Sequence, residues 1–285
     1  MTVPLSLLRP VWWGRPSACA ALQPRKPCLF FLLTVALLAP AALRAQDNYE
    51  VQVYGSELVP PGQTMVELHS NFTFQGSKDA VEGVRPDNHA LHETLEITQG
   101  ITPWFETGFY VFTSYRAGEG WQYVGDHIRP RVSIPEDWKW PVGLSLSTEF
   151  GYERRSYSTD TWTLEVRPII DKTLGPWYLC FNPTLDRSFH GAEVSKGVVF
   201  APNVKIGYAF SKKVNAGLEY YGSVGSITGF DPLRDQQQAI VPAIDLDLSP
   251  NWEFNLGAGV GMTSGTDHLL VKMILGRRLR FGRKS

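Results

Sequence analysis

Cysteine is scarce in this sequence, and its positions leave no room for a disulfide framework. There are three cysteines, and two of them, Cys19 and Cys28, lie in the first 45 residues. Cys180 remains alone in the rest of the chain. A lone cysteine excludes an intramolecular disulfide, a CxxC redox motif and a cysteine-rich metal site.

Long basic tracts and helical patterns are also lacking. The chain has 27 Lys and Arg against 28 Asp and Glu, and five of the basic residues but no acidic one lie in residues 1–45. The remainder, with 22 basic and 28 acidic residues, is mildly acidic, which argues against a nucleic-acid partner. Beyond residue 45 no apolar run reaches the length of a membrane-spanning helix, and no 3.6-residue stripe is evident.

The first 45 residues are typical of a secretory signal peptide. A basic region is followed by the apolar run 28–42 and by the small residue Ala45 before Gln46. A membrane anchor is the alternative, but the run falls short of the roughly 20 residues that a spanning helix needs. We therefore expect a secreted chain that begins near Gln46.

The stretch 240–262 shows the pattern that dominates the rest of the chain. Two arms flank Ser249-Pro250-Asn251, and in each arm apolar and polar or small residues alternate. Successive side chains of a strand point to opposite faces, so this alternation predicts a hairpin with one apolar face and one polar face.

The same alternation predicts twelve strands, most of them roughly 10 to 14 residues long: 64–76, 88–101, 104–116, 121–134, 142–154, 160–172, 177–189, 197–210, 214–227, 240–248, 252–262 and 268–281. Strands of this length exceed those of soluble sheets and suit a tilted crossing of a bilayer. An even number of such strands predicts an all-β, transmembrane, antiparallel up-and-down β-barrel over residues 64–281. Residues 46–63, which end near Pro60-Pro61, are expected to form a periplasmic extension, and residues 282–285 a C-terminal tail.

Connection lengths and aromatic residues support this prediction. Short turns alternate with longer polar segments, as in outer-membrane barrels with periplasmic turns and external loops. Five tryptophans lie at the short turns and predict an aromatic girdle at one headgroup layer: Trp104, Trp138, Trp140, Trp177 and Trp252. A soluble β-sandwich is the alternative, but it would show shorter strands.

The polar face of such a barrel would line its lumen. Charged residues at mid-bilayer cannot face hydrocarbon without a cost of roughly 2–4 kcal/mol, so they are expected inside. The predicted lumen-lining residues are Glu67, His69, Glu96, Glu106, His127, Arg129, Arg131, Glu149, Glu165, Arg167, Lys205, Glu219, Asp245, Asp247, Glu253, Lys272 and Arg278. They could brace the wall as ion pairs or act as a selectivity site. Gly257, Gly259 and Gly261 would leave one stretch of wall smooth.

Other chemistry receives little support from the sequence. Glu67, His69, His92 and Glu96 could form a carboxylate–imidazole metal site, or they could simply be solvated lumen residues. No GxSxG, HExxH or phosphate-binding loop occurs in a usable setting, so we assign no catalytic residue and no cofactor.

Two hairpin phrases carry a resemblance to a known family. Ile101-Thr102-Pro103-Trp104-Phe105-Glu106-Thr107-Gly108 and Leu248-Ser249-Pro250-Asn251-Trp252-Glu253-Phe254 resemble hairpins of a bacterial outer-membrane family. Its members are labelled MetA-pathway phenol-degradation or transporter-like proteins. The resemblance, over about residues 64–281, implies a barrel with a role in solute passage and supplies no catalytic residue.

We therefore expect a protein of the Gram-negative outer membrane that passes small solutes, of unknown identity, through a narrow lumen of mixed charge. Its other partners would be outer-membrane lipid and the barrel-assembly machinery. A closed-lumen barrel with a structural or surface-interaction role is the main alternative. A membrane-embedded hydrolase is a remote one.

Overall fold

A computed structural model describes residues 48–280, and strands make up most of them. Twelve long strands form the wall, with bounds β1 Gln63–Gln75, β2 Leu91–Thr102, β3 Phe105–Arg116, β4 Gly120–Ser133, β5 Gly143–Glu153, β6 Asp160–Leu174, β7 Trp177–Gly191, β8 Val198–Ser211, β9 Val214–Ser223, β12 Gln237–Ser249, β13 Trp252–Gly261 and β14 Leu269–Arg280. Only two short 3-10 helices occur in this range, η1 Glu136–Trp138 and η2 Ala192–Lys196. Within residues 48–280, no helix is both long and apolar enough to span a membrane.

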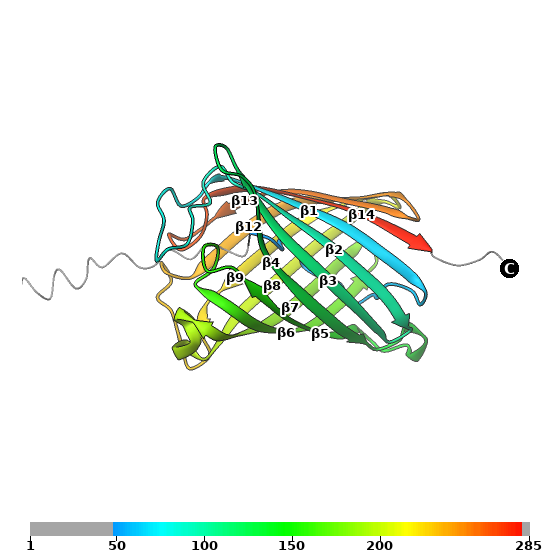
Figure 1. The fold of residues 1–285 in the computed structure, drawn as a ribbon. Helices are drawn as coiled ribbons and strands as arrows, with labels where there is room; N and C mark the ends of the chain where they lie inside the picture. Colours follow the sequence, from blue (N-terminus) through cyan, green and yellow to red (C-terminus); the bar gives the residue numbers. More distant parts are fainter. Residues whose placement is uncertain (1–47, 281–285) are drawn as a thin grey trace, which may run out of the picture. The chain divides into compact units, whose positions relative to one another are not determined.

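The twelve long strands close into an antiparallel barrel (Figure 1). Each long strand pairs with its neighbour in sequence, and β1 pairs with β14 to close the ring, for example at Leu68 opposite Leu275. The predicted fold class is confirmed. One predicted strand, 214–227, is divided: β9 ends at Ser223, and β10 (Gly225–Ser226) pairs with β11 (Gly229–Phe230) and with the edge of β8.

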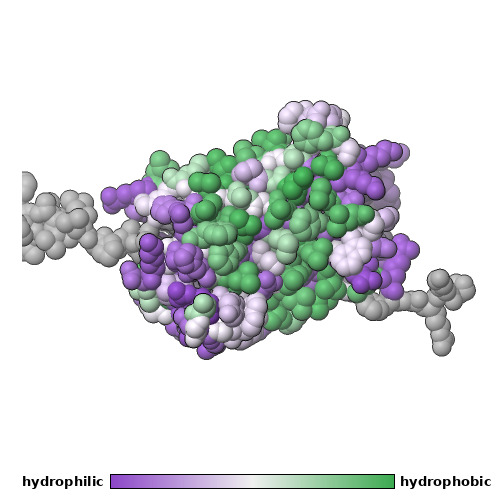
Figure 2. All heavy atoms as spheres, turned by 90° about the horizontal axis from the view of Figure 1, so that it is seen from above, coloured by the Kyte–Doolittle hydropathy of each residue, from purple (hydrophilic) through white to green (hydrophobic). Residues whose placement is uncertain are grey.

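The outer surface of the barrel is apolar. Figure 2 shows a broad band of hydrophobic side chains between two hydrophilic ends. Outward residues such as Phe109, Ile128 and Leu256 are 47%, 51% and 41% exposed, which suits contact with lipid rather than with a protein core. The five predicted girdle tryptophans are also exposed, at 36% to 64%.

The two rims of the barrel differ. One rim, here called the short-turn end, carries tight connections such as Gly175-Pro176, together with η1. The other rim, the long-loop end, carries longer connections such as 76–90 and 224–236. This asymmetry agrees with the predicted alternation of connection lengths.

A β-bulge in β4 breaks the predicted alternation of faces. Phe112 is opposite Gly125 but Thr113 is opposite Tyr123, so Val124 is an extra residue in the ladder. Strict alternation from the outward Ile128 predicts that Val124 faces lipid, yet its side chain is fully buried inside the barrel with Phe112. A bulge changes strand direction and parity locally, which period-2 reasoning cannot anticipate.

Candidate functional site: the barrel lumen

Inward charges of β2, β3 and β4 form one buried network. The strand register sets Glu106 opposite Arg131, with Arg129 two residues away on the same face. Arg129 Nη2 lies 2.6 Å from Glu96 Oε1, and Nη1 lies 3.4 Å from Glu106 Oε1. Arg131 Nη1 is 3.5 Å from the same Glu106 oxygen. These charges stay inside the wall because each has an opposite charge within reach.

A second network joins β8, β9, β12 and β14. Lys205 lies directly opposite Glu219 in the ladder, with Nζ 3.1 Å from Oε1, and 2.8 Å from Asp245 Oδ2. Lys272, which is fully buried, pairs with the other oxygen of Glu219. Four strands are therefore tied together by two lysines and two carboxylates, which stiffens this side of the barrel.

A third set of charges lies toward the long-loop end. His127 Nδ1 is 2.6 Å from Glu149 Oε1, across the β4–β5 pair. Arg167 is held by Glu165 at 2.7 Å and by Glu50, which precedes the barrel, at 3.6 Å. The participation of Glu50 shows that a segment outside the strands enters the lumen.

That segment, residues 48–62, runs through the inside of the barrel and leads into β1 (Figure 1). At the long-loop end Asn48 Nδ2 donates to Asp267 Oδ2 at 2.9 Å. At the short-turn end the Val59 N–H donates to Glu106 Oε2 at 2.7 Å. The sequence predicts a periplasmic extension over residues 46–63. The segment instead lies in the lumen, because inward side chains satisfy its backbone polar groups.

Polar contacts with the wall continue along the whole segment. Lys272 Nζ donates to the Val51 carbonyl oxygen at 3.0 Å, and the Tyr54 N–H donates to Asn182 Oδ1 at 2.9 Å. Further contacts are made by Thr94 to the Tyr49 carbonyl, Arg131 to the Gly55 carbonyl and Ser56 to Asp171. Polar wall residues thus replace the partner strand that this stretch of chain lacks.

Apolar contacts add to the polar ones. Val51 and Val53 are buried against inward apolar residues of the wall, namely Ile169, Tyr221, Val241 and Leu270. Tyr49 packs in a second cluster with Tyr110, Phe112 and Val124. The segment in the lumen covers these inward apolar residues and shields them from water.

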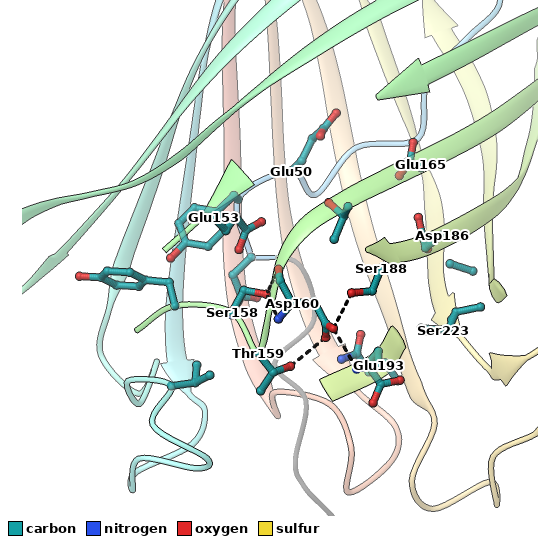
Figure 3. Close-up of a pocket in the computed structure, with 18 of the residues that line it drawn as sticks. Glu50, Glu153, Ser158, Thr159, Asp160, Glu165, Asp186, Ser188, Glu193 and Ser223 are labelled. Atoms are coloured by element: carbon teal, nitrogen blue, oxygen red, sulfur yellow. Dashed lines mark hydrogen bonds between the residues drawn. The ribbon is translucent and has the colours of Figure 1, made fainter. Parts of the chain in front are cut away.

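The segment leaves a large cavity at the long-loop end. Its volume is about 730 Å³, and Glu50, Arg167, Asp186 and Lys196 are among its lining residues. Figure 3 shows Asp160 at the centre of this lining, where its carboxylate accepts hydrogen bonds from Ser188 and from the Glu193 N–H. Eleven Asp and Glu side chains line the cavity, against five Arg and Lys. The cavity is therefore polar and biased toward negative charge.

A smaller cavity lies toward the short-turn end. It measures about 110 Å³ and is lined by Gln52 and Val53 of the segment together with Glu67, Asp247 and Glu253 of the wall. Different residues of the segment therefore line the two cavities, Asn48–Glu50 the large long-loop cavity and Gln52 and Val53 the small short-turn cavity.

The structure distributes the predicted lumen residues among these features. Most of the seventeen take part in the three networks or line the two cavities. Asp247 is exposed at the rim, and Arg278 is half-buried near the end of β14. Of the metal set, Glu67, His69 and Glu96 come together, whereas His92 lies apart with its ring 4.8 Å from Tyr49. The three glycines of β13 do not leave a smooth wall, because Val241 and Leu270 fill the space in front of Gly259.

Sequence reasoning missed the contribution of the segment and of its partners Asn182 and Asp171. A signal was present: Tyr110, Phe112 and Leu270 are apolar residues at inward positions of otherwise polar faces. An apolar residue facing a water-filled lumen needs something to cover it.

The closed barrel, its apolar belt and its charged interior define a β-barrel of the outer membrane. Residues 127–270 match the family described as "Putative MetA-pathway of phenol degradation", and because this match spans half of the chain, the protein belongs to that family. The resemblance drawn from the hairpin phrases is thereby confirmed. A search of curated proteins found no match.

Two solved structures share the fold. The COG4313 outer membrane channel from Pseudomonas putida F1 is 10% identical, with a TM-score of 0.56, over 81% of this chain and 100% of that one. The NanC porin, solved in a rhombohedral crystal form, is 8% identical, with a TM-score of 0.51, over 76% of this chain and 100% of that one. At these identities the likeness is one of fold.

Proposed function

We propose that this protein conducts small polar solutes across the outer membrane, and that residues 48–62 restrict the passage. The observation that carries the proposal is the polar cavity of about 730 Å³ at the long-loop end, together with a second cavity toward the short-turn end and a segment without regular secondary structure that lines both. Because the segment is not part of the sheet, its movement can change the width of the lumen without disrupting the strands of the barrel. The short-turn end would face the periplasm.

The charge of the long-loop cavity supports a preference among solutes. Carboxylates outnumber basic side chains among its lining residues, and Glu165 and Asp186 are directly opposite each other in the β6–β7 ladder. Fixed negative charge at a mouth concentrates cations and excludes anions. Cationic or neutral solutes are therefore the favoured class.

The solved structures named above support a channel rather than an enzyme, since one is an outer membrane channel and the other a porin. A closed barrel with a structural role is the second candidate. It is favoured by the two apolar clusters that hold Tyr49, Val51 and Val53 in the lumen. The two functions differ in one respect: the channel requires residues 48–62 to move and open the lumen, and the structural barrel does not.

Planar-bilayer recordings separate them. The refolded barrel is compared with a variant in which residues 48–58 are replaced by a Gly/Ser sequence of equal length. For a restricted channel we expect low or intermittent conductance in the native protein and a larger, steadier conductance in the variant. Heat-modifiable mobility on gels checks that both barrels are folded. If neither conducts while both are folded, the channel function is overturned.

A further inference from the structure

Glu67, His69 and Glu96 form a buried group that the ion-pair networks do not fully explain. One ligand atom from each residue lies within 4.8 Å of the others. Glu67 and His69 belong to β1 and Glu96 to β2, so the group sits on two hydrogen-bonded strands near the closing seam of the barrel. All three side chains are buried, and His69 is fully enclosed.

The strand register places two like charges opposite each other. Glu67 and Glu96 are direct partners in the β1–β2 ladder. Like charges at directly opposed positions destabilise a sheet, and the cost rises when the pair is buried. Arg129 neutralises part of this negative charge because it pairs with Glu96, but Arg129 also pairs with Glu106. The Glu67–Glu96 face therefore has room for a further positive charge.

The histidine supplies an independent observation. Neither ring nitrogen of His69 has a hydrogen-bond partner, and the same is true of Glu96 Oε2. His69 Nε2 lies 3.3 Å from Glu96 Oε2, which is an ion-pair distance, but no hydrogen bond of normal geometry joins the two atoms. Leaving a buried polar atom unsatisfied costs roughly 1–3 kcal/mol. A cation held between the nitrogen and the oxygen would satisfy both at once.

The separation suits a metal ion. Two ligand atoms at about 2.0–2.1 Å from a tetrahedral Zn²⁺ lie about 3.3 Å apart. The carboxylate of Glu96 is already oriented, because its other oxygen accepts a hydrogen bond from Thr98 at 2.7 Å as well as from Arg129. Neighbours that hold a ligand in this way are typical of protein metal sites.

Access is provided from one side. Glu67 lines the cavity of about 110 Å³ at the short-turn end, whereas His69 and Glu96 lie behind it. An ion entering this cavity would meet Glu67 first, and a water molecule from the cavity could complete its coordination. One imidazole and two carboxylates favour a divalent transition ion of the Zn²⁺ class over Ca²⁺, which prefers oxygen ligands alone.

We propose that Glu67, His69 and Glu96 bind one divalent transition-metal ion such as Zn²⁺ inside the barrel wall. The ion would fasten β1 to β2 beside the seam and neutralise the opposed carboxylates. This inference does not depend on whether the barrel conducts.

Titration of the tag-free, refolded barrel with Co²⁺ and Zn²⁺ tests the proposal. We expect one Co²⁺ per chain, seen as visible absorption of a four-coordinate ion, displaced by one equivalent of Zn²⁺. His69→Gln and Glu67→Gln should each weaken binding at least tenfold. His92→Gln is the matched control, because it changes a different buried histidine, on β2, and should leave binding unchanged.

A second readout covers variants that fold poorly. Zn²⁺ should raise the temperature at which the native barrel loses heat-modifiable mobility, and it should not do so for Glu67→Gln. The proposal is overturned if the native protein binds no ion stoichiometrically. It is also overturned if His69→Gln binds as tightly as the native protein, since the ion would then sit among other carboxylates.

Discussion

Lys272 and Val51 are joined by a hydrogen bond of 3.0 Å between the lysine ammonium and the valine carbonyl oxygen. This one contact links the ion-pair network of the wall to the segment that occupies the lumen, because the same ammonium pairs with Glu219. Lys272 thus couples the charge of this network to the position of the segment.

Replacing Lys272 by methionine should loosen the segment and destabilise the barrel. The change removes the donor to Val51 and leaves Glu219 with only Lys205 as a cationic partner. Breaking a buried ion pair costs on the order of 3 kcal/mol, so urea unfolding of the refolded barrel should shift by about that amount. Lys212→Met at an exposed short turn is the control and should change nothing. Unchanged unfolding of the Lys272 variant would contradict this account.

The contact between Asn48 and Asp267 should respond to pH. Burial, and then the nearby Asp87 carboxylate, raise the pKa of Asp267 from 3.8 to about 8. Because the folded-state pKa lies above the unfolded one, folded Asp267 binds its proton more tightly. Stability from this group is therefore fully present below about pH 4 and is lost as the pH rises through about 8.

The expected result is a lower free energy of unfolding at pH 9 than at pH 6. Asp267→Asn keeps the acceptor for Asn48 and removes the charge, so its stability should vary less between these two pH values. Parallel urea titrations of both proteins at the two pH values measure the difference. Equal pH dependence in the two proteins would exclude Asp267 as the responsible group.

Charge reversal in the long-loop cavity should alter ion selectivity. Asp186 lines that cavity, and it faces Glu165 across the β6–β7 ladder. Asp186→Lys should reduce the preference for cations, which the reversal potential in a salt gradient reports. Asp137→Lys, on exposed η1 at the other rim, provides the same charge change outside the lining. A selectivity that shifts equally in both variants would place the effect outside the cavity.

The prediction that Leu256 faces lipid can be tested by comparing arginine substitutions at two depths in the membrane. Leu256 is 41% exposed and lies midway along β13, whereas Leu248 lies near the short-turn rim. Leu256→Arg should destabilise the barrel by roughly 2–4 kcal/mol, and Leu248→Arg by only about 0–1 kcal/mol. Unfolding in detergent-free liposomes gives both values. Equal effects would show that Leu256 does not face the hydrocarbon core.

Much of the wall was predictable from the sequence, for a simple physical reason. A strand in a membrane barrel meets lipid on one face and the lumen on the other, so its pattern has a period of two along its whole length. Phe109 and Ile128 follow this rule and face outward. Twelve strands were therefore expected, and their bounds agree with the structure to within a few residues at most ends.

The contents of the lumen were harder to predict, because residues 48–62 do not form a strand and do not pair with a neighbouring strand. Residues 48–62 make their hydrogen bonds to side chains such as Asn182 and Glu106, which are far away in sequence. The bulge at Val124 is invisible for a related reason: one extra residue costs little locally but reverses the face of what precedes it. Register was also needed to bring Glu67 opposite Glu96 and to leave His92 aside.

The path of residues 48–62 makes their number matter. The segment is fastened by Asn48 at one rim and by Gly62, whose N–H donates to the Gly100 carbonyl, at the other. The number of residues between these two points fixes where each side chain lies along the lumen. Tyr49 and Val51 contact their partners only when this number is unchanged. If a single residue between Asn48 and Gly62 were removed, the segment could keep its attachment at only one of these residues in the same position. The contacts near the other attachment would then be displaced. The length of this stretch is therefore constrained even where its individual side chains are not.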